Sequence, residues 1–189
     1  MGPFGLSETG LSISPTNNHG LLANIVLEPP FEMPAQTISF YWKTDGKSKG
    51  GIFTSDSPLR GCLEKLSIIS IDLDLVITIF RHDCSKASAN IIVQNVFVRD
   101  QFTFVAITYD PKILTIFNDQ GDVLATSAGV EMNQQITRRI FLGFGNDEFK
   151  NEIRIISNIQ SIACLAVYKG VLTSKEIASL PCACQLGYR

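Results

Sequence analysis

The stretch that decides the fold runs from Ile69 to Phe80 and reads Ile-Ser-Ile-Asp-Leu-Asp-Leu-Val-Ile-Thr-Ile-Phe. Every odd position in it is isoleucine or leucine, and most even positions are Ser, Asp or Thr. Successive side chains of a β-strand point to opposite faces, so this period of two predicts one face toward a core and the other toward water. The pattern fits either one long strand or a tight hairpin that turns near Asp72 and Asp74.

Similar alternation recurs along the chain and predicts an all-β fold. Residues 37–43 place Ile38, Phe40 and Trp42 on one face, so the only tryptophan is expected in the core. A second run covers residues 102–109, and its expected core-facing members are Phe102, Phe104, Ala106 and Ile107. Shorter candidate strands cover residues 21–27, 91–97, 113–117, 123–126, 140–144 and 162–168.

Turn-forming sequences separate these runs, as expected for a sandwich or a barrel of many short strands. They are Pro29-Pro30, Asp45-Gly46, Lys49-Gly50-Gly51, Asp110-Pro111, Asn118-Asp119-Gln120-Gly121 and Gly145-Asn146-Asp147. The segment around Asp110-Pro111 lies between two apolar runs and predicts a hairpin.

One helix is expected near the end of the chain. Thr173-Ser174-Lys175-Glu176 matches a capping box, in which the Thr hydroxyl and the Glu carboxylate each accept a hydrogen bond from a backbone N–H group of the first turn. Ile177 and Leu180 supply a short apolar face. Pro181 is expected to end the helix after two turns.

The composition narrows the class of protein. The 189 residues suit one large β-domain, and 45% hydrophobic with 18% charged residues argues against disorder. The net charge is −2 without a basic stripe, so nucleic acid is not an expected partner. No apolar run approaches the roughly 20 residues of a membrane span, so no membrane insertion of this segment is expected. The start of the chain lacks a signal-peptide pattern, which fits either a cytosolic protein or a trimmed secreted one.

Five cysteines bear on that choice, and they are Cys62, Cys84, Cys164, Cys182 and Cys184. None belongs to a C-x-x-C pair and the chain has two histidines, which argues against a zinc site. One interpretation is five buried thiols. The favoured one is two disulfides and one cysteine whose partner lies outside the chain, as in a protein of an oxidising compartment.

The order of these runs resembles the laminin-G-like and pentraxin-like branch of the concanavalin A-like sandwiches. The resemblance covers residues 20–181. It is carried by residues 37–43, 104–110, 114–121, 140–145, 165–168 and 171–177. The chain departs from the family pattern at Phe102-Thr103, where Trp-His is usual, and at Ala163-Cys164, where two acidic residues are usual.

This resemblance implies a two-sheet antiparallel jelly-roll sandwich with a short C-terminal helix. Residues 1–19 would form an N-terminal arm or an edge strand. It also implies an extracellular or cell-surface ectodomain that binds a protein or a glycan without catalysis. A carbohydrate-binding lectin module of a larger enzyme or surface protein and a glycoside-hydrolase-like sandwich are the alternatives.

The resemblance further implies particular pairs and sites. Cys164 would bond to Cys182 or Cys184, and Cys62 to Cys84. Residues 182–189 would begin a following cysteine-rich module similar to epidermal growth factor. No cofactor is firmly expected. Ca²⁺ would be held by Asp83, which follows a strand comparable to residues 76–80.

Candidate functional side chains are few. Asp72 and Asp74 share a strand face at a spacing of about 7 Å, but a solvated polar face explains them better than a hydrolase pair, so no enzyme is expected. Tyr41 points away from the Trp42 face and could stack on a sugar ring.

The remaining candidates are turn residues and basic residues. Asn118, Asp119 and Asp147 are the candidate ligand-binding groups in turns, although Asn and Asp favour turns for backbone reasons alone. A weakly basic rim for sulfated glycans could come from Lys43, Lys47, Lys49, Arg138, Arg139 and Lys150, and a solvated surface is the favoured interpretation of these. The sequence also leaves open a homodimer through an edge strand.

Overall fold

The computed structural model describes the backbone of residues 11–13, 15–16, 19–20, 23–31, 36–47, 49–55, 66–80, 87–110, 112–129, 137–142, 144–147, 152–155 and 160–185. Side chains are described over residues 36–47, 49–54, 66–79, 90–110, 112–129, 142, 161–168 and 170–181. The predicted calcium ligand Asp83 and the predicted partners Cys62 and Cys84 lie outside the described residues.

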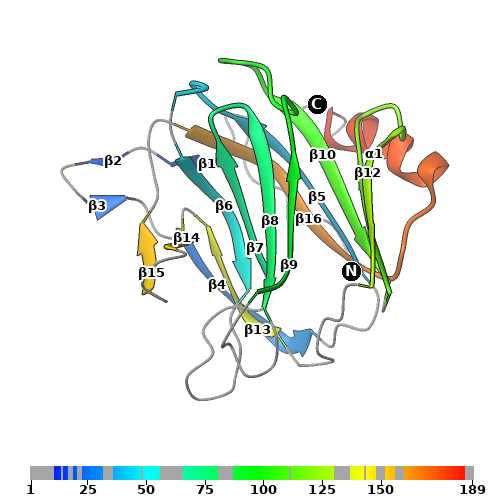
Figure 1. Cartoon of the computed structure of the whole chain (residues 1–189), viewed down its shortest axis with the longest axis horizontal. Helices are drawn as coiled ribbons and strands as arrows, with labels where there is room; N and C mark the ends of the chain where they lie inside the picture. The colour runs from blue at the N-terminus through cyan, green and yellow to red at the C-terminus, as the bar shows by residue number, and fades with distance from the viewer. Residues whose placement is uncertain are drawn as a thin grey trace.

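Two six-stranded antiparallel sheets make up the body of the protein (Figure 1). The first sheet runs in the order β1 (Leu11–Ile13), β16 (Gln160–Lys169), β5 (Gln36–Lys43), β10 (Thr103–Tyr109), β11 (Ile113–Phe117) and β12 (Val123–Ala128). The second sheet runs in the order β4 (Ala23–Phe31), β13 (Thr137–Leu142), β6 (Lys49–Ser55), β7 (Leu66–Ile71), β8 (Asp74–Phe80) and β9 (Ala87–Val93). Two small hairpins pair β2 (Pro15–Thr16) with β3 (His19–Gly20), and β14 (Phe144–Asp147) with β15 (Glu152–Ile155).

This architecture confirms the predicted all-β jelly-roll sandwich with a single short helix among the described residues. Part of the expected N-terminal arm, β1, is an edge strand that pairs with β16. The predicted hairpin around Asp110-Pro111 joins β10 to β11.

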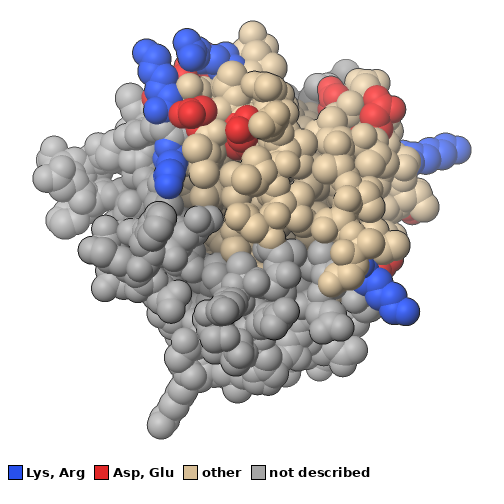
Figure 2. All heavy atoms as spheres, viewed as in Figure 1, with Lys and Arg blue, Asp and Glu red and all other residues tan. Residues whose placement is uncertain are grey.

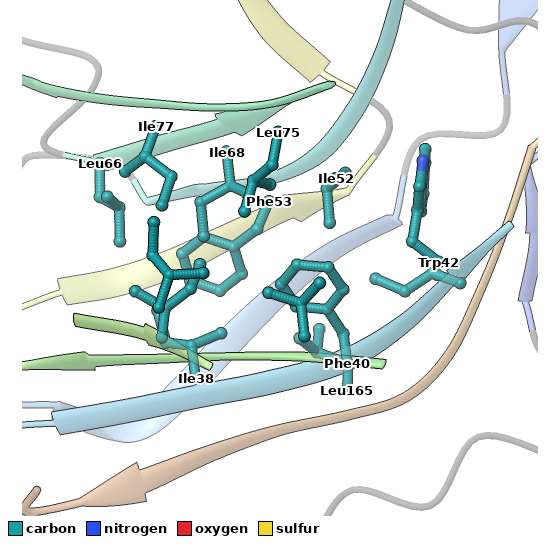
Figure 3. Close-up of a cluster of buried hydrophobic side chains, with 14 of the residues drawn as sticks. Ile38, Phe40, Trp42, Ile52, Phe53, Leu66, Ile68, Leu75, Ile77 and Leu165 are labelled. Atoms are coloured by element: carbon teal, nitrogen blue, oxygen red, sulfur yellow. The ribbon is translucent and has the colours of Figure 1, made fainter. Parts of the chain in front are cut away.

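The core lies between the two sheets (Figure 3). Ile38, Phe40 and Trp42 of the first sheet are buried, as the alternation predicted. They belong to one cluster with side chains of the second sheet such as Phe53. The indole Nε1 of Trp42 donates a hydrogen bond to the Ser70 hydroxyl at 3.1 Å, so the single buried polar atom of this ring is satisfied across the sandwich.

The deciding stretch forms a hairpin, β7–β8, rather than one long strand. Asp72 and Leu73 make a two-residue turn, in which Asp72 has a φ of 56°. Ile68 of β7 lies opposite Ile77 of β8, and both belong to the central cluster. Even-numbered positions of β7 and odd-numbered positions of β8 therefore face the core. Ile69 therefore points to the outer face, and the prediction that odd positions share one face throughout is wrong for β7.

Three predicted turns lie inside strands. Gly145-Asn146-Asp147 belongs to β14 and pairs with β15. Pro29-Pro30 falls within β4, at the edge of the second sheet, where a residue without an N–H group can leave its outer side unpaired. Lys49-Gly50-Gly51 begins β6, and a register shift against β7 follows directly, between Gly51 and Phe53. Glycine here marks an irregular strand instead of a chain reversal.

Strand β10 is buried on both faces. Val105 and Ile107 belong to the central core, whereas Phe104 and Ala106 lie in a second cluster on the outer face of the first sheet. Helix α1 (Ser174–Gln185) covers that face through Ile177. Phe102, predicted to face the core, precedes the strand and is 43% exposed, because the sheet begins at Thr103.

The capping box of α1 is confirmed. The backbone N–H of Thr173 donates to Oε2 of Glu176 at 2.8 Å, and the N–H of Glu176 donates to the Thr173 hydroxyl at 3.3 Å. The carboxylate accepts hydrogen bonds from both the N–H group and the hydroxyl of Thr173, and these lower the pKa of Glu176 below its ordinary 4.5.

The predicted end of the helix is wrong. α1 has twelve residues, and Pro181 lies inside it. Cys182 and Cys184 are therefore helical, and the domain boundary predicted after residue 181 falls within α1. No helix in the described part of the chain is long and apolar enough to cross a membrane.

Cys164 takes part in a disulfide bond. It has a φ of 50° and lies where the pairing of β16 with β5 shifts register, between Ala163 and Ala166. The side chains of the other four cysteines lie outside those described, so the pairing stays a prediction.

Candidate functional site

Three connections meet at one end of the sandwich, and we call them the rim. They are residues 44–47 between β5 and β6, residues 72–74 between β7 and β8, and residues 94–102 between β9 and β10. The third connection is the green loop at the top of Figure 1.

Hydrogen bonds tie the three connections together. The N–H of Asp100 donates to the Thr44 carbonyl at 2.8 Å, and the N–H of Phe97 donates to the Leu73 carbonyl at 3.0 Å. The N–H of Asn95 donates to Oδ1 of Asp74 at 2.8 Å. The rim therefore has a fixed shape rather than three independent loops.

The backbone of the rim also restricts which residues can occupy it. Asp72, Asn95 and Asp100 have φ values of 56°, 53° and 59°, in the left-handed region that Asn and Asp enter more readily than other non-glycine residues. Gly46 has a φ of 65°, and a Cβ at this position would lie 2.8 Å from Cδ2 of Leu73. Such conformations concentrate at ligand-binding sites, where the surrounding structure holds them in place.

The rim displays apolar and polar side chains to solvent. Phe102 is the one exposed aromatic ring among the described side chains, and Val98 near it in the loop is 50% exposed. Arg99 and Gln101 are exposed between them, and the Arg99 backbone bridges to Thr44. A loop that exposes an apolar ring together with guanidinium and amide groups can bind a ligand that has both a hydrophobic face and hydroxyl or carboxylate groups.

Both signs of charge occur around the rim. Asp45 and Asp72 lie in its turns together with the cations Lys47 and Arg99. Figure 2 shows basic and acidic side chains intermingled at the upper left of the molecule. Of the predicted basic set, Lys43, Lys47 and Lys49 lie in or next to the turn at residues 44–47, and the side chains of Arg138, Arg139 and Lys150 are outside those described.

Tyr41, the predicted sugar-stacking residue, lies on the outer face of the first sheet. Its ring meets Phe104 edge to face, with centroids 5.2 Å apart, and it packs against the cluster beneath α1. The ring is half-buried, so a ligand would reach only part of it. Its role in binding stays a prediction.

Asn118 and Asp119 lie in the turn between β11 and β12, at the same end of the first sheet as the rim. Oδ1 of Asn118 accepts hydrogen bonds from the N–H groups of Gln120 and Asp122, both at 2.9 Å, which engages this oxygen in the turn itself. Asp119 is exposed. Asp147 lies opposite Glu152 in the β14–β15 hairpin, so the structure does not gather the predicted residues into one cluster.

Asp72 and Asp74, the acidic residues considered for hydrolysis, take part in the turn and the hydrogen bonds of the rim. Asp72 occupies the hairpin turn, and Asp74 opens β8 with its carboxylate bound to the Asn95 amide. The prediction that they share a strand face is wrong, because the turn lies at Asp72. The described residues contain no group of three or more His, Cys, Asp and Glu side chains able to hold a metal ion.

Sequence reasoning did not single out the rim. Phe102 was assigned to the core because it continues the alternation of β10. Its neighbours Asp100 and Gln101 were the available signal, since a polar pair directly before an aromatic residue is typical of a loop.

No protein-family model matches the sequence, and no curated protein is similar to it. Solved structures do resemble the fold. The binding domain of botulinum neurotoxin DC in complex with "SialylT" has a TM-score of 0.63 and 17% identity, over 91% of this chain and 41% of that one. The SAP-like pentraxin of Limulus polyphemus has a TM-score of 0.60 and 14% identity, over 84% of this chain and 81% of that one.

A third solved structure is the CBM40 domain of the Ruminococcus gnavus IT-sialidase bound to alpha2,3 sialyllactose. It has a TM-score of 0.60 and 13% identity, over 79% of this chain and 83% of that one. All three are concanavalin A-like jelly-roll sandwiches, and this chain shares that fold. The chain spans 41% of the length of two botulinum neurotoxin binding domains that it resembles.

Proposed function

We propose that this chain is a non-catalytic glycan-binding module whose ligand site is the rim. The observation that carries the proposal is the exposed ring of Phe102 in a loop that hydrogen bonds hold in place, with Arg99 and Gln101 exposed in the same loop. A sugar has an apolar face that can stack on an aromatic ring and hydroxyl groups that can accept hydrogen bonds from guanidinium and amide groups. A fixed loop loses little conformational entropy when it binds.

The ligands of two structural relatives support this class of partner. One relative carries alpha2,3 sialyllactose, and the other is in complex with "SialylT". A protein ligand and membership of the laminin-G-like or pentraxin-like branch remain part of the proposal. The disulfide at Cys164 supports an extracellular or cell-surface setting, where such bonds persist.

An array of neutral and sialylated glycans, probed with the whole chain, tests the proposal. Phe102→Ala should weaken binding of the best ligand about tenfold, or about 1.4 kcal/mol. Val171→Ala is the matched control, because Val171 is similarly exposed, at 46%, but follows β16. Binding that Phe102→Ala and Arg99→Ala leave unchanged would move the site away from the rim, toward Tyr41 and Asp119 or toward Asp147.

Calcium is a separate question for the same module. The resemblance implies Asp83 as a ligand, and Ca²⁺ prefers several oxygen ligands. A melting curve in millimolar calcium against one in EDTA tests this. Saturating calcium would raise Tm by about 5 to 10 °C. Identical curves would remove calcium from the proposal and leave the rim as a metal-independent site.

A further inference from the structure

Among the described strands, β12 forms an edge of the first sheet. It stands last in the strand order, and all its residues keep some exposure to solvent. Val123 is 56% exposed and Leu124 39%. An edge strand presents a row of backbone N–H and C=O groups that can pair with another chain.

The hydrogen bonds of β12 show which groups face outward. The N–H of Gly129 donates to the Lys112 carbonyl at 2.9 Å. The next residues of β12 and β11 pair without a shift, from Ala128 opposite Ile113 to Ala125 opposite Ile116. Bonded and non-bonded pairs alternate along an antiparallel ladder. Residues 125, 127 and 129 therefore bond to β11, and the N–H and C=O groups of Thr126 and Ala128 point away from the sheet.

From Ala125 onward, this edge lacks the usual protection against pairing. Residues 123–129 read Val-Leu-Ala-Thr-Ser-Ala-Gly, without a charge or a proline. The one irregularity, a register shift beside Phe117, precedes the regular stretch that starts at Ala125. Monomeric proteins commonly place lysine, proline or a bulge on such an edge.

The neighbouring edge has the same character. β9, the edge strand of the second sheet, lies beside β12 and also contains no charged residue. Ile92 on β9 is 58% exposed. Figure 2 shows mostly uncharged side chains across the described surface over β9, with charged side chains toward the ends of this flank of the sandwich, which consists of β9 and β12.

We propose that the flank binds a second copy of this chain, through antiparallel pairing of β12 with β12 about a two-fold axis at Ser127. The axis places Thr126 opposite Ala128 of the second copy and Ala128 opposite its Thr126, which gives four hydrogen bonds. One strand is then complementary to itself, as a two-fold interface requires. A neutral strand also brings no like charges together. The first sheets of the two copies then form one continuous sheet across the dimer.

Sedimentation equilibrium of the whole chain from micromolar to millimolar concentration tests the proposal. We expect a concentration-dependent dimer. Thr126→Pro removes an N–H group that points away from β11, so it should leave the fold intact and raise the dimer dissociation constant at least tenfold, or about 1.4 kcal/mol. Thr126→Val is the matched control, because it keeps the N–H group and should dimerise like the parent.

Two further measurements keep the test decisive if Thr126→Pro does not fold. Thr126→Lys keeps the backbone donor but brings two like charges close to the axis, and it should also give a monomer. Hydrogen exchange should protect the Thr126 and Ala128 amides only at high concentration. A monomer at every concentration, or a dimer that both Thr126→Pro and Thr126→Lys leave intact, would overturn the proposal.

Discussion

At the scale of single residues, buried polar atoms show how closely the sequence is matched to its fold. Trp42 could not have been placed in a core without a partner for its indole N–H group, and Ser70 supplies it. The sequence predicted the tryptophan correctly but assigned Ser70 to a solvent face, because the pattern did not decide between one long strand and a hairpin.

Replacing Ser70 tests that hydrogen bond. Ser70→Ala leaves the indole N–H buried without a partner, so the free energy of unfolding should fall by about 1 to 3 kcal/mol. Urea titration of the single variants Ser70→Ala and Trp42→Phe and of the double variant measures the coupling. Strictly additive losses would show that the hydrogen bond contributes nothing.

The Thr173 and Glu176 pair predicts a pH effect. The folded pKa of Glu176 is lowered, so its contribution is fully present above the unfolded value of 4.5 and is lost as the pH falls through the folded pKa. Compared with the parent, Glu176→Gln should lose stability at neutral pH and show little difference at low pH. Melting curves from neutral pH downward check this, and a constant difference across that range would contradict it.

At the scale of elements, the β7–β8 turn decides both the register of the second sheet and the shape of the rim. Asp72 stands in the left-handed region, which costs a β-branched residue about 1 to 2 kcal/mol. Asp72→Val should therefore destabilise the fold by that amount, whereas Asp72→Asn and Asp72→Gly should be tolerated. Chemical denaturation of the three variants makes the comparison, and equal losses would remove the conformational explanation.

Helix α1 carries the second element-scale prediction. Its last described turns contain Cys182 and Cys184, either of which is predicted to bond to Cys164. Digestion without reducing agent should release a peptide that joins β16 to α1. A peptide that joins Cys164 to Cys62 or Cys84 instead would contradict the pairing that the family resemblance implies.

At the scale of the whole molecule, the sequence predicted the sandwich well but did not indicate that the three connections of the rim come together. Apolar and polar residues alternate along a strand because one of its faces meets the core. Ile38, Phe40 and Trp42 show this alternation in the sequence and are buried in the structure. A rim depends on which loops become neighbours after folding. Nothing local to Phe102 indicates that residues 44–47 and 72–74 will lie beside it.

A strand that is covered on both faces also limits which amino-acid substitutions the protein can accept during evolution. β10 lies between the central core and α1, and six of its seven residues are buried, with the seventh half-buried. In a scan of all single substitutions, β10 should tolerate polar replacements at almost none of its positions, whereas β12 should tolerate them widely. Related sequences would then diverge slowly at β10 and fast at β12, although only β11 lies between these two strands.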